Sequence, residues 1–120
     1  MTTFTKVILS ESVDGRAIKV AATATVGTLI HSGSAVDTTM DEVWLYAVNS
    51  DTVARKLTIE WGGTASPGDQ IELTIPAEAG LVLVAPGLLI RGSVTPLNIT
   101  AFCATANVVC IQGYVNQITV

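Results

Sequence analysis

The sequence predicts an all-β domain, an antiparallel β-sandwich or a jelly-roll-like barrel, with almost no helix. Apolar and polar residues alternate with a period of two, most clearly in residues 70–75, where Ile71, Leu73 and Ile75 share one face. Turn-forming residues separate short apolar runs along the 120-residue chain. No window shows the apolar spacing of three and four residues that a helix requires. Strands of this kind bury one face on a core and turn the other toward solvent or a partner.

Each expected strand ends at a turn signal or at a proline, which removes a donor from the hydrogen-bond ladder. The expected strands cover residues 5–9, 16–24, 28–32, 41–48, 55–61, 69–75, 80–84, 88–92, 97–103 and 108–118. The signals between them include Asp14-Gly15, Asn49-Ser50-Asp51, residues 62–69, Pro76, Pro86-Gly87 and Pro96. A single helical turn is expected around Thr38–Glu42. The stretch from Ala21 to Thr39 is open to three interpretations: a strand, a long loop or an arm that crosses to a neighbour.

Length and composition indicate one domain over residues 1–120, with residues 1–4 as a flexible N-terminal arm. Apolar residues make up 49% of the chain, and the mean hydropathy is +0.55. They come in short runs, so no membrane segment and no signal peptide are expected, which indicates synthesis in the cytoplasm. Because the net charge is −4 and the six basic residues are scattered, nucleic-acid binding is not expected. This apolar, charge-poor composition favours a subunit with a contact surface.

Cys103 and Cys110 are the only cysteines. A tight turn at Ala106-Asn107 would make them cross-strand neighbours in a hairpin, at a spacing somewhat wide of good disulfide geometry. Since thiols stay reduced in the cytoplasm, we expect two small apolar residues in a core strand pair rather than a stapling disulfide.

No cluster of side chains predicts catalysis, a cofactor or a metal ion. His31 is the single histidine, and we expect it at the surface or at a strand edge. Asp37, Asp41 and Glu42 do not match a calcium loop and are expected to be solvated. The chain is therefore predicted to be neither an enzyme nor a cofactor-binding protein.

Trp44, Tyr46 and Trp61 raise the question of carbohydrate binding, since lectin-like sandwiches stack sugars on exposed aromatic rings. Aromatic residues are only 5% of this chain, and these three lie within or at the end of apolar strands. We expect them to be buried in the core or at a subunit seam.

Four segments carry a resemblance to a known family: residues 41–49 (DEVWLYAVN), 56–63 (KLTIEWGG), 75–81 (IPAEAGL) and the tail from Ala106 to Asn116. They resemble small virion proteins of tailed bacteriophages, usually encoded beside the major capsid protein, and the resemblance extends from about residue 5 to the end. It implies a β-rich head decoration (cement) protein that binds the capsid exterior. The implied partners are the major capsid protein and the chain itself, as a homotrimer.

The resulting hypothesis is a structural virion protein that stabilises the shell by clamping neighbouring capsid proteins. Two alternatives stay open: a head–tail connector or tail-associated virion protein, and a carbohydrate-binding module for host attachment. The candidate capsid contacts are Thr2, Thr3, Phe4, Arg16, Arg55 and Lys56. Each is also compatible with ordinary solvated surface.

Overall fold

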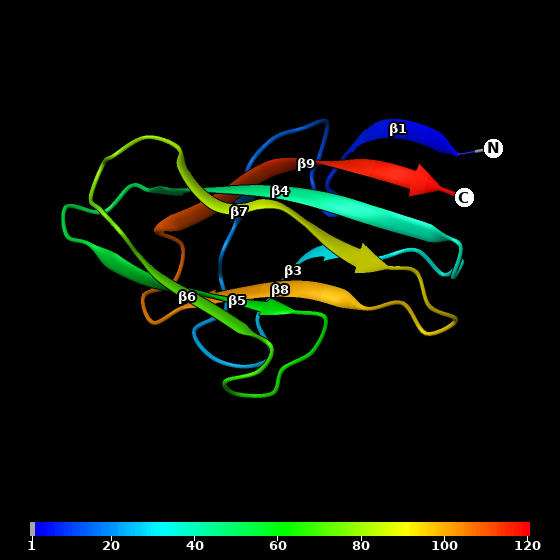
Figure 1. Ribbon diagram of the computed structural model, residues 1–120. Coiled ribbons are helices and arrows are strands. Elements are labelled where there is room, and N and C mark those ends of the chain that lie inside the picture. The colour runs from blue at the N-terminus through cyan, green and yellow to red at the C-terminus, as the bar shows by residue number, and fades with distance from the viewer. Residues whose placement is uncertain (1) are drawn as a thin grey trace.

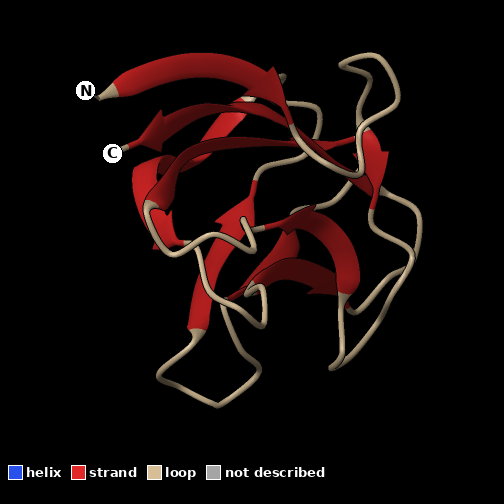
Figure 2. Ribbon diagram, turned by 90° about the vertical axis from the view of Figure 1, so that its right-hand side faces the viewer, coloured by secondary structure: helices blue, strands red, loops and turns tan. Residues whose placement is uncertain are grey.

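The computed structural model describes residues 2–120, which form nine strands in two antiparallel sheets and contain no helix. This confirms the predicted all-β sandwich. Figure 1 shows one sheet in the upper half of the molecule and the other below it, with both termini at the same end. Figure 2 shows the same strands from the side, joined by loops at both ends of the layers. No helix in the described part of the chain is long and apolar enough to cross a membrane.

Sheet A has the order β1-β9-β4-β7, with β2 pairing beside β1 on the same edge of β9. Its strands are β1 (Thr3–Ile8), β2 (Ile18–Lys19), β4 (Thr39–Asn49), β7 (Val82–Arg91) and β9 (Val109–Thr119). Sheet B has the order β3-β8-β5-β6. Its strands are β3 (Thr28–Ser32), β5 (Arg55–Trp61), β6 (Gln70–Ile75) and β8 (Asn98–Cys103).

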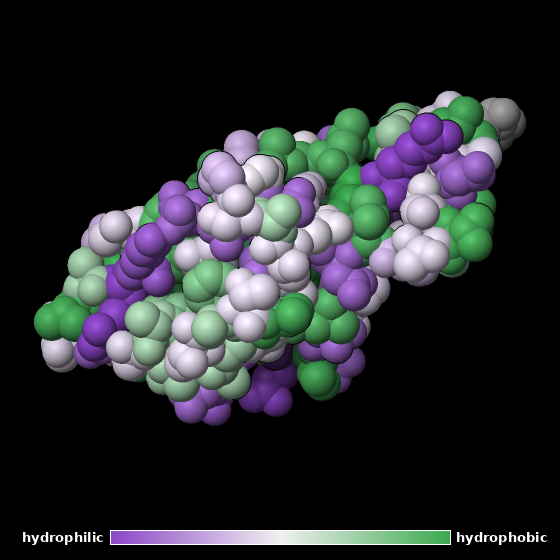
Figure 3. Space-filling model, turned by 90° about the horizontal axis from the view of Figure 1, so that it is seen from below, coloured by the Kyte–Doolittle hydropathy of each residue, from purple (hydrophilic) through white to green (hydrophobic). Residues whose placement is uncertain are grey.

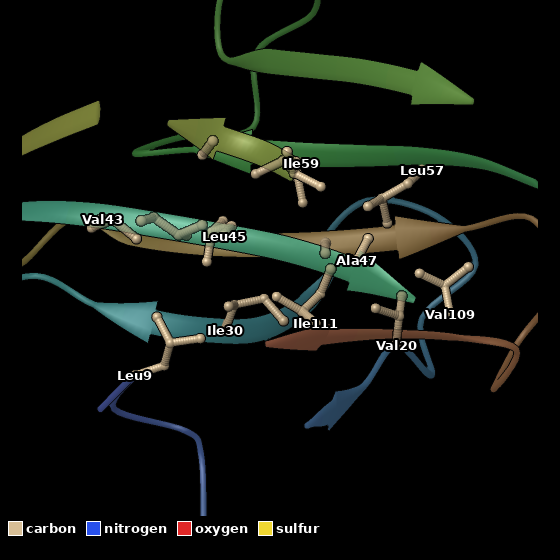
Figure 4. Close-up of a cluster of buried hydrophobic side chains, with 14 of the residues drawn as sticks. Leu9, Val20, Ile30, Val43, Leu45, Ala47, Leu57, Ile59, Val109 and Ile111 are labelled. Atoms are coloured by element: carbon tan, nitrogen blue, oxygen red, sulfur yellow. The ribbon is translucent and has the colours of Figure 1, made fainter. Parts of the chain in front are cut away.

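The core lies between the two sheets and is built from their inward-facing aliphatic side chains. Val43, Leu45 and Ala47 of β4 meet Leu57 and Ile59 of β5, and all five are fully buried (Figure 4). Leu9, Val20, Ile30, Val109 and Ile111 complete the part of the cluster labelled there. Burial of side chains of this size contributes about 1.5–3 kcal/mol each.

Strand β4 sorts its residues most strictly: buried and half-buried residues alternate over its whole length. Three of its inward residues are polar, namely Thr39, Asp41 and Asn49. Asn49 donates from Nδ2 to the carbonyl oxygens of Val53 and Ile75, each at 3.0 Å, which ties the end of sheet A to β6 of sheet B. Asp41 pairs with a histidine described below.

Three predicted boundaries were wrong. The expected break at Pro86-Gly87 lies inside β7, an edge strand, where Pro86 pairs with Trp44 and a bulge at Gly87 interrupts the pairing with β4. The expected helical turn at Thr38–Glu42 is instead the start of β4. The expected strand 16–24 contains only the two residues of β2.

The N-terminal arm is also shorter than expected. Thr3 and Phe4 belong to β1, where they pair with Thr119 and Ile118 of β9, because the C-terminal strand offers an unpaired edge. Thr2 is exposed and outside any strand, and Met1 lies outside the described residues.

The expected hairpin between the cysteines does not form. Cys103 ends β8 in sheet B, opposite Leu57, whereas Cys110 lies on β9 in sheet A, opposite Val48. The intervening loop crosses from one sheet to the other. Both thiols are free, Cys103 buried in the core and Cys110 half-buried on the other side of sheet A.

Gly113 in β9 is expected to be intolerant of a side chain. A Cβ there would collide with the backbone carbonyl oxygen of Trp44 on the adjacent strand. We predict that Gly113→Ala lowers the free energy of unfolding by about 1–3 kcal/mol, as measured in a denaturant titration. Gly68→Ala is the matched control, because a Cβ at that loop position meets nothing within 4 Å. Equal stability of the two variants would contradict the described packing of β9 on β4.

Candidate functional site

The outer face of sheet A is an exposed surface with many apolar residues, and we name it the A face. Residues directly opposite each other in antiparallel strands share a face, so the register identifies its members. They are Phe4, Lys6 and Ile8 of β1, Lys19 of β2, Met40, Glu42, Trp44, Tyr46 and Val48 of β4, Leu83, Pro86, Leu89 and Arg91 of β7, and Cys110, Gln112, Tyr114, Asn116 and Ile118 of β9. All of them retain exposure to solvent.

Two stacked aromatic rings form the centre of the A face. Trp44 and Tyr114 are cross-strand partners, their ring centroids lie 6.1 Å apart, and their planes differ by 10°. The Lys6 ammonium lies 5.0 Å from the centroid of the Tyr114 ring. On the other side, a Cβ on Gly87 would come within 2.9 Å of the Trp44 indole, so the indole packs directly against the β7 backbone. These contacts hold both rings in place while leaving them partly exposed.

Glu42 supplies the negative charge beside these rings. Its Oε2 accepts hydrogen bonds from Asn116 Nδ2 and from Trp44 Nε1, each at 2.8 Å. These two bonds, the one from Asn116 being the stronger cause, hold the pKa of Glu42 below its usual range. The carboxylate is therefore ionised at neutral pH, in the same row of the sheet as Lys6.

Large aliphatic and aromatic side chains continue the A face to its edges. Phe4 is 71% exposed, Leu89 54%, Ile8 48% and Leu83 47%. Single exposed apolar residues are normal, but a contiguous apolar surface on a soluble domain usually marks a contact site.

A hollow of about 500 Å³ opens beside the A face where sheet A is incomplete. Ile8 of β1 pairs with Tyr114, and Ile18 of β2 pairs with Ile111, so Gln112 and Gly113 of β9 have no strand partner on that side. The chain between β1 and β2 leaves the sheet there. Glu11, Val13, Arg16, Ala17 and Gln112 line the resulting space.

The centre of the outer face of sheet B, by contrast, is covered by the protein's own chain, because Thr58, Glu60 and Thr100 are buried there while Lys56, Glu72 and Thr74 stay exposed. The segment between β2 and β3 crosses it and is held by Glu60, whose carboxylate accepts hydrogen bonds from Gly27 N at 2.8 Å, Thr25 Oγ1 at 2.8 Å and Thr100 Oγ1 at 2.7 Å. This resolves the ambiguous stretch after Ala21 as a covering loop followed by β3. Figure 3 views the molecule from that side, where hydrophilic and hydrophobic residues are interspersed.

The environment of Glu60 lowers its pKa. Burial acts to raise it, but the hydrogen bonds from Thr100, Gly27 and Thr25 together outweigh that cost. Glu60 is fully buried and had no functional assignment from the sequence. Its role in the structure is to fasten the covering segment.

His31 is buried, with 4% of its surface exposed, which corrects the surface position expected for it, although β3 is an edge strand of sheet B. Its Nδ1 accepts a hydrogen bond from Ser10 N at 3.0 Å, so Nε2 donates to Asp41 Oδ2 at 2.7 Å. Asp41 Oδ1 accepts from Gln117 at 3.1 Å. Ser10 Oγ accepts a hydrogen bond from Ser32 N at 2.8 Å. The buried pair thus links β3 of sheet B to β4 of sheet A.

This pair also corrects the expectation that Asp37, Asp41 and Glu42 form one solvated acidic group. Asp41 faces the core and Glu42 the A face, because neighbouring residues of a strand point to opposite sides. Over residues 2–120, no three His, Cys, Asp or Glu side chains are grouped as metal ligands.

The six candidate capsid contacts do not gather in one patch. Thr2, Thr3 and Phe4 lie at the end of sheet A that carries Thr119, whereas Arg55 and Lys56 begin β5 near Ile75. Arg16 lies on the loop beside the hollow. The molecule is 48 Å long, so residues this far apart cannot form one contact patch.

Arg55 and Lys56 are moreover paired within the chain. Arg55 donates to Asp51 Oδ2 from Nη2 at 2.5 Å and from Nε at 2.8 Å, and it lowers the pKa of Asp51. Lys56 forms an ion pair with Glu72.

Sequence patterns predicted alternating half-buried strands but not which strand faces adjoin. The A face is assembled from strands up to about a hundred residues apart along the chain, so only the register reveals it. Trp44, Tyr46 and Trp61 are all half-buried in the single chain, so none of them lies wholly in the core, and their burial at a subunit seam stays a prediction.

Comparison with protein-family models, curated proteins and solved structures gives no significant match.

The pKa of Glu60 predicts a pH-dependent stabilisation. A carboxyl group whose pKa is lower in the folded than in the unfolded state stabilises the fold above its unfolded pKa, about 4.3 for Glu, and this stabilisation is lost as the pH falls through the folded value. We predict that Glu60→Gln lowers the free energy of unfolding by about 1 kcal/mol at pH 7, because neutral hydrogen bonds replace charge-assisted ones.

Urea titrations at pH 7 and at pH 3 measure this effect, and the difference between wild type and variant should shrink at pH 3. Glu11→Gln is the control, since Glu11 is exposed. A difference that is the same at both pH values would contradict the assignment.

Proposed function

We propose that this protein is a structural virion subunit that binds the outside of a tailed-phage capsid and stabilises the shell. The observation that carries the proposal is the A face, an apolar surface with a central pair of stacked aromatic rings that no part of the described chain covers. The sequence resemblance supports a location on the capsid of a virion. The fold supports a rigid subunit with a surface suited to association.

The proposed stabilisation depends on many copies of the same modest contact across a symmetric shell. A decoration subunit makes several modest contacts on a symmetric shell, and each contact holds neighbouring capsid proteins together. A β-sandwich with a fully buried aliphatic core suits that task because it transmits strain without deforming. The polar groups of its core are partnered: none of the described buried side-chain nitrogen or oxygen atoms lacks a hydrogen bond.

A connector or tail-associated protein of the same virion would use the same surfaces in a ring or tube. Copy number separates the two roles, since a decoration protein is present at a large share of the shell's lattice positions and a connector only at one vertex.

One observation favours a carbohydrate-binding module as a second candidate. Trp44 and Tyr114 are partly exposed aromatic rings, and Glu42 and Asn116 beside them carry hydrogen-bonding groups. Glycan-array binding that is lost in Trp44→Ala would favour this role over the structural one.

The proposal predicts that the protein co-sediments with phage heads and that heads without it rupture at lower temperature. A gradient of purified particles, followed by a thermal DNA-release assay with and without added protein, measures both. Recovery of the protein only in the free soluble fraction of a lysate would contradict the proposal. A chain lacking residues 2–4 tests the proposed N-terminal contact in the same assay, and unchanged occupancy would remove that contact from the proposal.

A further inference from the structure

Opposite charges lie in one row across the centre of the A face. Lys6 on β1 pairs with Asn116 on β9, and Asn116 pairs with Glu42 on β4. Neighbouring strands are about 4.8 Å apart, so the two charged residues lie about 10 Å apart on either side of β9. The positive charge therefore lies on one side of β9 and the negative charge on the other, at about the same distance from it.

This arrangement is complementary to itself. Two sheets that pack face to face lie about 10 Å apart with their strands within about 30° of each other. A two-fold axis that runs along β9, between two such faces, places β1 of each copy over β4 of the other. Lys6 of each copy then faces Glu42 of the other, and Tyr114 faces Tyr114.

The other charges on the A face do not oppose this pairing. Lys19 lies beside Cys110 at one end of β9, and Arg91 lies beside Met40 at the other end, on the opposite edge of the sheet. Both are at corners of the face. Although the chain carries a net charge of −4, Glu42 is the only acidic residue on the A face, so two copies meet there without repulsion between carboxylates.

In the same arrangement, a side chain of the second copy lies over the hollow beside Gln112. Tyr46 of β4 lies in register with Gln112. The two-fold axis moves the second copy's β4 over the side of β9 from which the chain between β1 and β2 departs. The second copy's Tyr46 therefore lies over the hollow, where Arg16 and Gln112 offer polar groups to its hydroxyl.

The overlapping part of the A face is large enough for a specific pair. The two-fold axis superposes β1, β9 and β4 of the two copies and leaves β7 beyond the edge of the other copy's β1. Because β4 and β9 are eleven residues long, the overlapping sheet plane measures on the order of 500 Å² per copy at usual strand spacings. Side-chain relief adds to this value. A typical specific interface buries about 800 Å² on each partner.

We propose that the A face binds the A face of a second copy of this chain about a two-fold axis along β9. The inference deepens the proposed function by naming the partner of its central surface. It differs from the homotrimer that the sequence resemblance implies, because an isologous face of this kind closes in pairs. Contacts with a capsid then fall to the remaining surfaces.

Cys110 provides a direct test with the unmodified protein. It lies on the A face and on β9, so the axis brings it opposite the second copy's Cys110 at about the sheet spacing of 10 Å, which is too far for a disulfide. A bismaleimide with an arm longer than that spacing should join two chains of wild type. It should also join two chains of Cys103→Ala, which lacks only the buried thiol, but not of Cys110→Ser.

The same reaction can overturn the inference. Absence of a joined pair in wild type, or its persistence in Cys110→Ser, would do so. Light scattering should give twice the chain mass of 12.5 kDa, and a mass of one or three chains would also overturn it.

Charge reversal tests the pairing of Lys6 with Glu42. Lys6→Glu should raise the dissociation constant of the pair by at least about tenfold, because two carboxylates then face each other. The double variant Lys6→Glu, Glu42→Lys should recover most of that loss, since the charges are exchanged within each chain. Lys56→Glu, outside the A face, is the control and should associate like wild type.

The double variant separates this inference from the proposed function. No recovery in a variant that keeps the wild-type circular dichroism spectrum would overturn the two-fold pairing. A chain that binds shells but stays monomeric in solution leaves the proposed function standing and removes the pair. A chain that forms pairs but does not bind shells leaves the two-fold pairing standing and contradicts the proposed function.

Discussion

The structure depends on the two-residue period of β4, the strand that is paired along its length with β9 and with β7. Its inward residues supply Val43, Leu45 and Ala47 to the core, and its outward residues supply Glu42 and Trp44 to the A face. A shift of one residue in this register would exchange the two sets, exposing the core residues and burying the carboxylate. One geometric constraint thus fixes both the stability of the sandwich and the composition of its association surface.

The outer faces of the two sheets differ in how much of them the protein's own chain covers. The centre of sheet B is covered by its own connecting segment, which the buried carboxylate of Glu60 holds through hydrogen bonds from Thr25 and Gly27. Over residues 2–120, sheet A has no such cover, and its Trp44 ring is held by the β7 backbone at Gly87 and by the stacked ring of Tyr114. A protein that needed only to fold would gain from covering both faces, since exposed apolar surface favours association. This asymmetry is the physical reason for assigning the association of subunits to sheet A.

The alternation in the sequence was sufficient to predict the fold class and most strand positions, because that period is a local property. It did not reveal how strands from distant parts of the chain combine. Pro86 predicts a strand boundary, but an edge strand with a bulge accommodates it. The spacing of Cys103 and Cys110 predicts hairpin neighbours, but their strands lie in different sheets. The sequence does not predict the burial of His31, because its partners Ser10 and Asp41 are brought to it only by folding. The A face was missed for the same reason.

The central claim is that the A face is buried when the protein associates, and the fluorescence of Trp44 reports on this most directly. In a Trp61→Phe variant, Trp44 is the remaining indole. Its emission should shift to shorter wavelength as protein concentration rises, in step with the increase in mass, because association removes water from the ring. An emission maximum that stays constant while the mass increases would show that association uses another surface and would contradict the account.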